Sequence, residues 1–247
     1  MDISRTDIGS GTVEIPVSDG SIMSGYSSRP VGAIRPTAVV VAHELFGVND
    51  DIKTVVDDLA RAGHLTVAPE FYHRHTAPGR ALERDDAGRA AGFGLLHELT
   101  RTDALADVSA ALRWLTADPA VTDVAMIGFS AGGHLAYYAA TQLPLRATAV
   151  LYGGWLTSTE IPLSRPNPTL ELTGGITGHL GYLVGDQDFL IDAGQRDQIE
   201  RALTRAGVDH QIVVLPGAEH AFFWPGTPAY HPEARRQAWQ HILTMLN

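Results

Sequence analysis

The fold is decided by residues 124–142, which read VAMIGFSAGGHLAYYAATQ. Val124 to Phe129 is an apolar run that predicts a strand, and the Ala-rich run from Ala131 to Gln142 predicts a helix. Between them, residues 128–132 match the pattern G-x-S-x-G, whose small residues let strand and helix approach closely while a sharp turn lifts the hydroxyl clear of the sheet. We therefore expect Ser130 to be a nucleophile; the alternative is an incidental serine in a glycine-rich turn.

Outward from this stretch, short β-type runs alternate with longer helical patterns. This alternation predicts an α/β fold, with a mostly parallel central sheet and helices on both faces. Thr12 to Val17 and Ser21 to Ser28 flank Asp19-Gly20 and predict an N-terminal antiparallel hairpin. The remaining predicted strands cover residues 37–42, 65–68, 147–152, 180–184 and 211–215, and the remaining predicted helices cover residues 49–62, 103–115 and 233–246.

Length and composition favour one domain over residues 1–247, because 45% of the residues are hydrophobic and can form a large core. The region from about 153 to 179 contains several prolines and paired glycines. It is predicted to be a long irregular connection that covers part of a site.

The net charge and the residue content exclude several classes of partner and of site. Lys and Arg number 18 against 28 for Asp and Glu, a net charge of −10, so we expect neither nucleic acid nor a membrane surface as a partner. The absence of Cys excludes disulfides, thiolate metal sites and a cysteine nucleophile. No secretion signal or apolar span is recognisable, which favours a cytoplasmic protein. We also expect a monomer or small homo-oligomer that uses no cofactor and no metal.

A serine hydroxyl needs a neighbouring base and an orienting carboxylate, and downstream loops offer both. His220 follows the strand predicted at 211–215 in a Gly-containing turn, and we expect it to be the base; the alternative is a core or surface histidine. Asp186 and Asp188 both follow the strand predicted at 180–184. Composition does not choose between them, because either carboxylate can cap a helix.

The developing oxyanion of an acyl-transfer reaction needs N–H donors. These are usually the backbone N–H of the residue after the nucleophile and one from the loop after an early strand. In this sequence the two positions are Ala131 and Leu45.

Four segments in order resemble the dienelactone hydrolase family, within the α/β-hydrolase superfamily, along nearly the whole chain. They are His43-Glu44-Leu45-Phe46-Gly47, the Gly128 to Gly133 turn, Gly185-Asp186-Gln187-Asp188, and Gly217-Ala218-Glu219-His220-Ala221-Phe222. The resemblance implies that the orienting carboxylate ends a G-x-x-D pattern, which selects Asp188, and that His220 is the base. It also implies that Glu44 contacts the nucleophile in the resting enzyme; the alternative is an acid favoured by a helix N-terminus.

The sequence departs from the family in two ways. The best-known members use cysteine where this chain has Ser130, and a hydroxyl is harder to deprotonate, so we expect conventional base catalysis by His220. Members acting on dienelactone hold the substrate carboxylate with two arginines. Arg89 matches one, and Trp224 stands at the other. We therefore expect a bulkier, apolar or aromatic acyl group, lined by Phe223 and Trp224.

Two alternatives accompany these binding residues. Arg89 can be a surface helix residue, with Arg84 nearby, and the aromatic residues can be part of the core.

The function predicted is hydrolysis of a small ester or lactone through an acyl-enzyme on Ser130. The altered region around Trp224 motivates a second hypothesis, a cyclase or isomerase of a biosynthetic intermediate that forms no acyl-enzyme.

Overall fold

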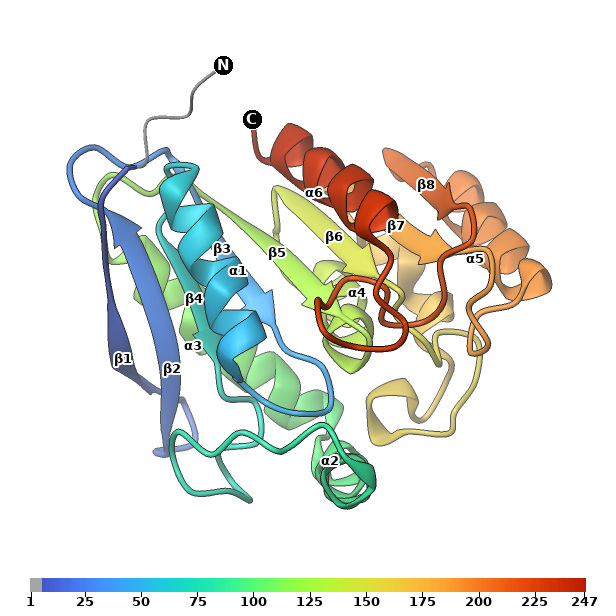
Figure 1. Cartoon of the computed structure of the whole chain (residues 1–247), viewed down its shortest axis with the longest axis horizontal. Coiled ribbons are helices and arrows are strands. Elements are labelled where there is room, and N and C mark those ends of the chain that lie inside the picture. Colours follow the sequence, from blue (N-terminus) through green and yellow to red (C-terminus); the bar gives the residue numbers. More distant parts are fainter. Residues whose placement is uncertain (1–5) are drawn as a thin grey trace. The chain divides into compact units, whose positions relative to one another are not determined.

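The computed structural model describes residues 6–247 and divides into two compact units, one ending at Met126 and the other running from Ile127 to Asn247 (Figure 1). Each unit is described by itself. The organisation of residues 1–247 as one domain stays a prediction.

The first unit is built on four strands in the order β1-β2-β4-β3. Its elements are β1 (Ile8–Pro16), β2 (Ile22–Pro30), β3 (Thr37–Ala42), α1 (Asp50–Arg61), β4 (Thr66–Pro69), α2 (Asp86–Glu98) and α3 (Arg101–Thr116). β1 pairs antiparallel with β2, and the register brings Pro16 opposite Ile22 across a turn in which Gly20 has a φ of 89°. The predicted hairpin is confirmed, although its first strand begins earlier than expected, at Ile8.

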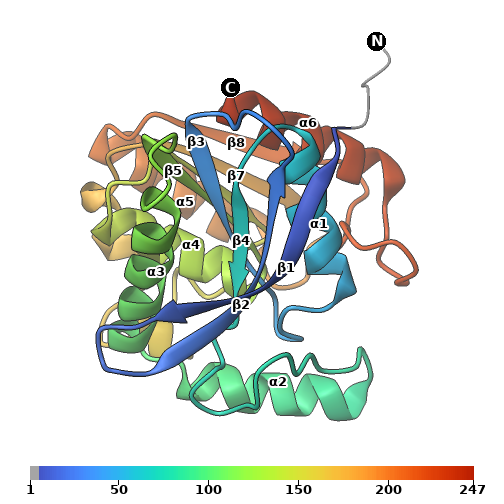
Figure 2. The ribbon, with the colours of Figure 1, turned by 90° about the vertical axis from the view of Figure 1, so that its left-hand side faces the viewer.

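Two helices of this unit, α1 and α3, lie close to the predicted ranges 49–62 and 103–115, and α2 lies outside the predicted ranges. Asn49 caps α1 by accepting a hydrogen bond from the Ile52 N–H at 3.1 Å, the contact that an N-cap asparagine supplies to an orphan donor. The apolar face of α1 buries Ile52, Val55, Val56, Leu59 and Ala60. Both α1 and α3 contact β4, and they lie on its opposite sides (Figure 2).

The second unit contains the end of β5 (Asp123–Phe129), which runs across the unit boundary, and the elements that follow it. These are α4 (Ala131–Gln142), β6 (Ala147–Leu151), β7 (His179–Gly185), α5 (Ala193–Ala206), β8 (His210–Leu215) and α6 (Pro232–Leu246). β7 pairs parallel with β6 and with β8. α6 packs on β6 and β7 from the front of Figure 1, and α4 packs on β6 from behind.

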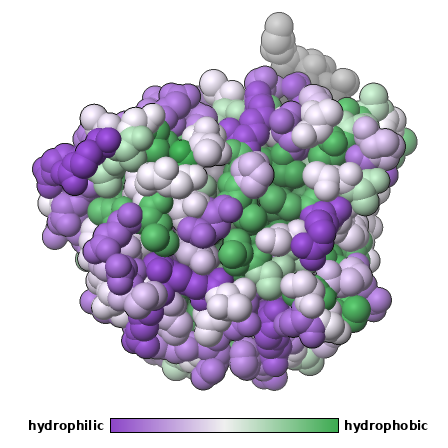
Figure 3. Space-filling model, turned by 180° about the vertical axis from the view of Figure 1, so that it is seen from behind, coloured by the Kyte–Doolittle hydropathy of each residue, from purple (hydrophilic) through white to green (hydrophobic). Residues whose placement is uncertain are grey.

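The mostly parallel α/β class is confirmed, with helices on both faces of the strands and the antiparallel hairpin at the N-terminal end. The segment between β6 and β7 is irregular as predicted, apart from two short 3-10 helices, η1 (Pro162–Ser164) and η2 (Thr169–Gly175). On the face in Figure 3, hydrophilic side chains surround areas of apolar ones. Within residues 6–247, no helix has the length and apolar character needed to cross a membrane.

Candidate active site

Ser130 lies on a tight turn between β5 and α4. Its φ of 51° and ψ of −112° are unusual for a residue with a side chain, and such strain persists only where the surrounding structure enforces it. A Cβ at Gly128 would collide with the carbonyl oxygen of Gly132, so the motif glycine allows the close approach that the turn requires. The turn is fixed further by the Ser130 N–H, which donates to the carbonyl of Leu151 at 3.0 Å.

Ser130, His220 and Asp188 form one hydrogen-bonded chain within the second unit. The hydroxyl of Ser130 lies 2.9 Å from Nε2 of His220, and Nδ1 of His220 lies 2.9 Å from Oδ2 of Asp188. Because the ionised carboxylate only accepts, Nδ1–H of His220 donates to it, which leaves Nε2 as the acceptor for the serine proton. The Asp188 side chain is fully buried, and that of His220 is largely so.

The two candidate carboxylates, Asp186 and Asp188, lie in the loop after β7 and have different partners. Asp188 also accepts a hydrogen bond from the Leu190 N–H at 2.9 Å, so both of its oxygens are engaged. The exposed Asp186 accepts instead from the Gly217 N–H at 2.7 Å, and so links the loop after β7 to the loop after β8. Of the two, Asp188 lies beside His220 and Asp186 serves the loop conformation.

Two aromatic rings contact His220 edge to face. The buried ring of Tyr152 has its centroid 5.1 Å from that of His220, and the ring of Phe189 has its centroid 5.6 Å away. Tyr152 and Ala221 also have positive φ angles, of 41° and 62°, so backbone strain accumulates around the chain of three residues. Sequence reasoning missed Phe189. The available signal was an aromatic residue directly after the selected aspartate.

The structure places Phe223 and Trp224 in the core of the second unit. Both are buried, and their ring centroids lie 5.1 and 4.7 Å from that of Phe129 on β5. Arg235 of α6 lies over the Phe223 ring, 5.3 Å from its centroid. This environment fits the alternative that these aromatic residues are part of the core. Their contact with substrate stays a prediction.

Glu44 and Leu45 belong to the first unit and follow β3. Nδ1 of the buried His43 donates to the carbonyl oxygen of Glu44 at 2.7 Å, which fixes the backbone just before Leu45. The carboxylate of Glu44 pairs with Arg84 at 3.2 Å, and Arg84 also pairs with Asp51 at 2.6 Å. Sequence reasoning named Arg84 only as a neighbour of Arg89, because a contact across 40 positions leaves no local pattern.

Helix α2 packs tightly on the same segment. A Cβ at Gly92 would come within 2.6 Å of the Leu45 carbonyl oxygen, so the glycine is what lets α2 approach. Arg89 lies exposed on this helix. The roles of Glu44, Leu45 and Arg89 beside Ser130 stay predictions.

The first unit contains a second buried aspartate–histidine pair. Oδ1 of Asp107 lies 3.2 Å from Nε2 of His73, and the guanidinium of Arg74 binds both oxygens of Asp107 at 2.7 and 2.8 Å. Arg74 also binds Asp19 at 2.7 Å. These contacts tie the hairpin turn, the loop after β4 and helix α3 together. Among residues 6–247, no group of three or more His, Asp or Glu side chains is arranged to hold a metal ion.

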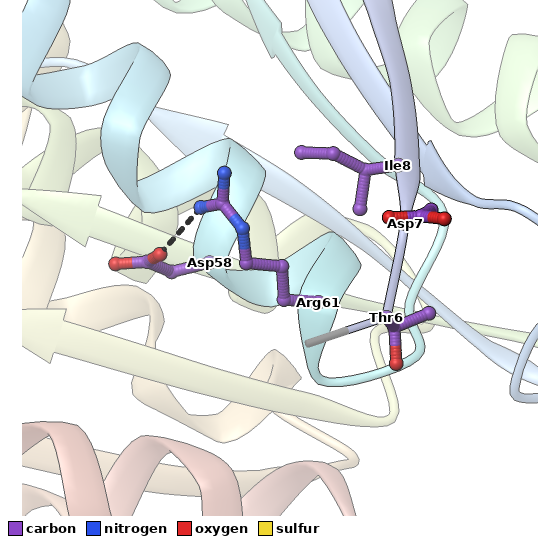
Figure 4. Close-up of a pocket in the computed structure, with 5 residues that line it drawn as sticks. All are labelled: Thr6, Asp7, Ile8, Asp58 and Arg61. Atoms are coloured by element: carbon purple, nitrogen blue, oxygen red, sulfur yellow. Dashed lines mark hydrogen bonds and ion pairs between the residues drawn. The ribbon is translucent and has the colours of Figure 1, made fainter. Parts of the chain in front are cut away.

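A hollow of 540 Å³ lies elsewhere in the first unit (Figure 4). It is lined by Thr6, Asp7, Ile8, Asp58 and Arg61. Arg61 is already paired with Asp58 at 2.8 Å, and the described lining contains neither serine nor histidine. This hollow therefore offers none of the nucleophilic chemistry of the Ser130 turn.

Comparison with known proteins places the chain in one family. The dienelactone hydrolase family model matches residues 23–247. A Synechocystis protein described as "Putative carboxymethylenebutenolidase" is 34% identical over 241 residues, which cover 96% of this chain and 95% of that protein. A crystal structure from Klebsiella pneumoniae, described as a "Putative Dienelactone Hydrolase", has a TM-score of 0.86 at 27% identity and covers 97% of this chain and 98% of its own.

A second solved structure, a dienelactone hydrolase-like promiscuous phosphotriesterase from metagenomic libraries, has a TM-score of 0.77 at 25% identity. The match covers 96% of this chain and 97% of that one. The family match and the relative in Synechocystis each span nearly the whole sequence. The chain therefore belongs to the dienelactone hydrolase family.

Proposed function

We propose that this protein hydrolyses a small carboxylic ester or lactone through an acyl-enzyme on Ser130. The observation that carries the proposal is the chain of two 2.9 Å contacts from the Ser130 hydroxyl through His220 to Asp188. Membership of the dienelactone hydrolase family supports the substrate class.

In the proposed reaction, Nε2 of His220 takes the proton from Ser130 as the oxygen attacks the carbonyl carbon. Asp188 holds the imidazole in the required tautomer and stabilises its charged form. His220 then gives the proton to the departing alcohol oxygen, which leaves the acyl group on Ser130. A water molecule, deprotonated by His220, releases the acid by the same steps in reverse order.

The backbone N–H of Ala131 is one proposed donor to the oxyanion. Ala131 is the first residue of α4. The first N–H groups of a helix lack partners inside the helix, so they can donate to a negatively charged oxygen. Leu45 is the second proposed donor. The hydrogen bond from His43 to the carbonyl of Glu44, the residue before Leu45, supports a fixed orientation of this segment.

Glu44 has no proton-transfer role in this proposal. Its pairing with Arg84 supports an anchoring function for its carboxylate, and His220 already provides a base in contact with the hydroxyl. Substrate contacts of Arg89, Phe223 and Trp224, a cytoplasmic location, and the monomeric or small oligomeric state remain expectations.

The test is hydrolysis of a short-chain aryl ester by the wild type and by Ser130→Ala. Because the three residues act as a unit, kcat/KM should fall at least about 1000-fold. Ser10→Ala, an exposed serine on β1, is the matched control and should retain activity. Equal activity of the wild type and Ser130→Ala would contradict the acyl-enzyme on Ser130. Failure of a fluorophosphonate to label Ser130, together with turnover of a biosynthetic intermediate without uptake of water, would favour a cyclase or isomerase on the same fold.

A further inference from the structure

Phe189 is an aromatic residue left almost entirely in water. The residue is 80% exposed, whereas the nearby Asp188 and Ile191 are buried. Among the described residues, the other large apolar side chains with high exposure are Ile22, Val31 and Val214. Phe189 differs from these in its position, because its ring meets that of His220 edge to face, with centroids 5.6 Å apart.

The backbone on both sides of this ring is fixed. Oδ2 of Asp188 binds His220, and Oδ1 of the same carboxylate binds the Leu190 N–H at 2.9 Å. The Ile191 N–H donates to the carbonyl of Asp188 at 3.4 Å, which closes the turn over Phe189. A single carboxylate therefore sets both the orientation of His220 and the position of the residues that flank Phe189.

His220 passes a proton to the departing alcohol oxygen in the proposed reaction. A ring at the edge of His220 is consequently close to the alcohol portion of an ester, and contact with an apolar alcohol would remove both surfaces from water. Aromatic groups gain further from edge-to-face packing on a phenyl ring.

We propose that Phe189 is a specificity-determining residue that contacts the alcohol portion of the substrate and favours an apolar, above all an aromatic, leaving group. In a lactone the same contact is made with the ring carbons next to the ester oxygen. This inference rests on the proposed hydrolysis through Ser130.

The test compares benzyl and methyl acetate, which share one acyl group and release alcohols of similar acidity. In Phe189→Ala the ratio of kcat/KM for the benzyl ester to that for the methyl ester should fall roughly tenfold, equivalent to about 1.4 kcal/mol. Phe189→Leu, which keeps apolar surface without the ring, should lie between the two. Val31→Ala, an exposed apolar residue after β2, should leave the ratio unchanged.

Four results would overturn the inference. Unchanged kcat/KM values for both esters in Phe189→Ala would exclude the contact while leaving the proposed function intact. An equal loss of kcat/KM with both esters would show that Phe189 acts only by supporting His220. If sedimentation shows that Phe189→Ala converts an oligomer to a monomer without changing the ratio, the ring serves contact between copies of this chain. If the wild type hydrolyses neither ester and Ser130 is not acylated, the proposed function itself fails.

Discussion

Residues 6–247 contain two buried aspartate–histidine pairs, of which one continues to a serine and the other does not. Asp188 and His220 in the second unit are 2.9 Å apart, and Asp107 and His73 in the first unit are 3.2 Å apart. Both carboxylates are fully buried. By composition and burial, the two pairs are nearly the same.

They differ in what surrounds the carboxylate. Arg74 binds both oxygens of Asp107, so a permanent positive charge already balances that aspartate, and Asp19 holds Arg74 from its other side. Bonds to Asp107 and Asp19 hold the pKa of Arg74 above its usual range. Among residues 6–247, no Lys or Arg pairs with Asp188, so a positive charge on His220 is what this carboxylate can stabilise. In the proposed function, the residue beside each pair therefore decides its role: Ser130 gives one pair a catalytic role, and Arg74 gives the other a structural one.

Exchanging each aspartate for asparagine should separate these roles, and the largest effect is expected at Asp188. Asp188→Asn removes the acceptor that sets the His220 tautomer, and kcat/KM should fall on the order of 10⁴-fold with the fold retained. The control is Asp186→Asn, two residues earlier, which should change kcat/KM less than about tenfold. A loss at Asp186 as large as that at Asp188 would reverse the assignment made from the geometry.

Asp107→Asn should affect stability instead of catalysis. Arg74 would lose its buried partner but keep Asp19 and some contact with water, so the free energy of unfolding should fall by about 2–3 kcal/mol, less than for a fully buried orphan charge. Denaturant unfolding measures the change, and kcat/KM per folded molecule should stay within a few-fold of wild type. A catalytic loss comparable to that of Asp188→Asn would mean that both pairs serve the reaction.

A third buried histidine sharpens the comparison, because the ring of His43 bonds a carbonyl in place of a carboxylate. Burial lowers the pKa of His43 to about 4, against the smaller opposing effect of its hydrogen bond to Glu44. Between that value and the unfolded pKa of 6.5, the unfolded chain binds more protons than the folded protein. His43 should therefore contribute a loss of about 2 kcal/mol in stability between pH 7 and pH 5.

Guanidinium unfolding at pH 7 and pH 5 tests this effect, the smallest of the three expected at the buried histidines and aspartates. His43→Gln stays neutral throughout, so its stability should fall less than that of the wild type over the same interval. Parallel losses in the two proteins would show that other groups cause the pH dependence.

The sequence predicted those parts of the site that are encoded locally. The Ser130 turn depends on small residues at fixed positions between an apolar strand and a helix, and the structure contains that turn with the expected boundaries. His220 was selected by its position after a late strand, and it lies in contact with Ser130. The start of α1 near residue 49 was predicted in the same way, since helix capping is a short-range interaction.

Contacts between residues far apart in the chain, and the exposure of single side chains, could not be predicted from local sequence patterns. Asp186 and Asp188 stand in one loop, and composition did not choose between them. The family resemblance selected Asp188, and the geometry shows that Asp188 reaches His220 while Asp186 reaches Gly217. The pairing of Glu44 with Arg84 joins residues far apart in the chain. Likewise, an aromatic residue in a sequence does not reveal whether it is buried like Trp224 or exposed beside the site like Phe189.

The most direct test of the central claim is covalent labelling of the intact protein with a fluorophosphonate. The account predicts one label per chain on Ser130, located by peptide mass spectrometry, with labelling greatly slowed in His220→Gln and unaffected in His73→Gln. Absence of a label, or a label on a different residue at the same rate in all three proteins, would contradict the assignment of Ser130 as the nucleophile activated by His220.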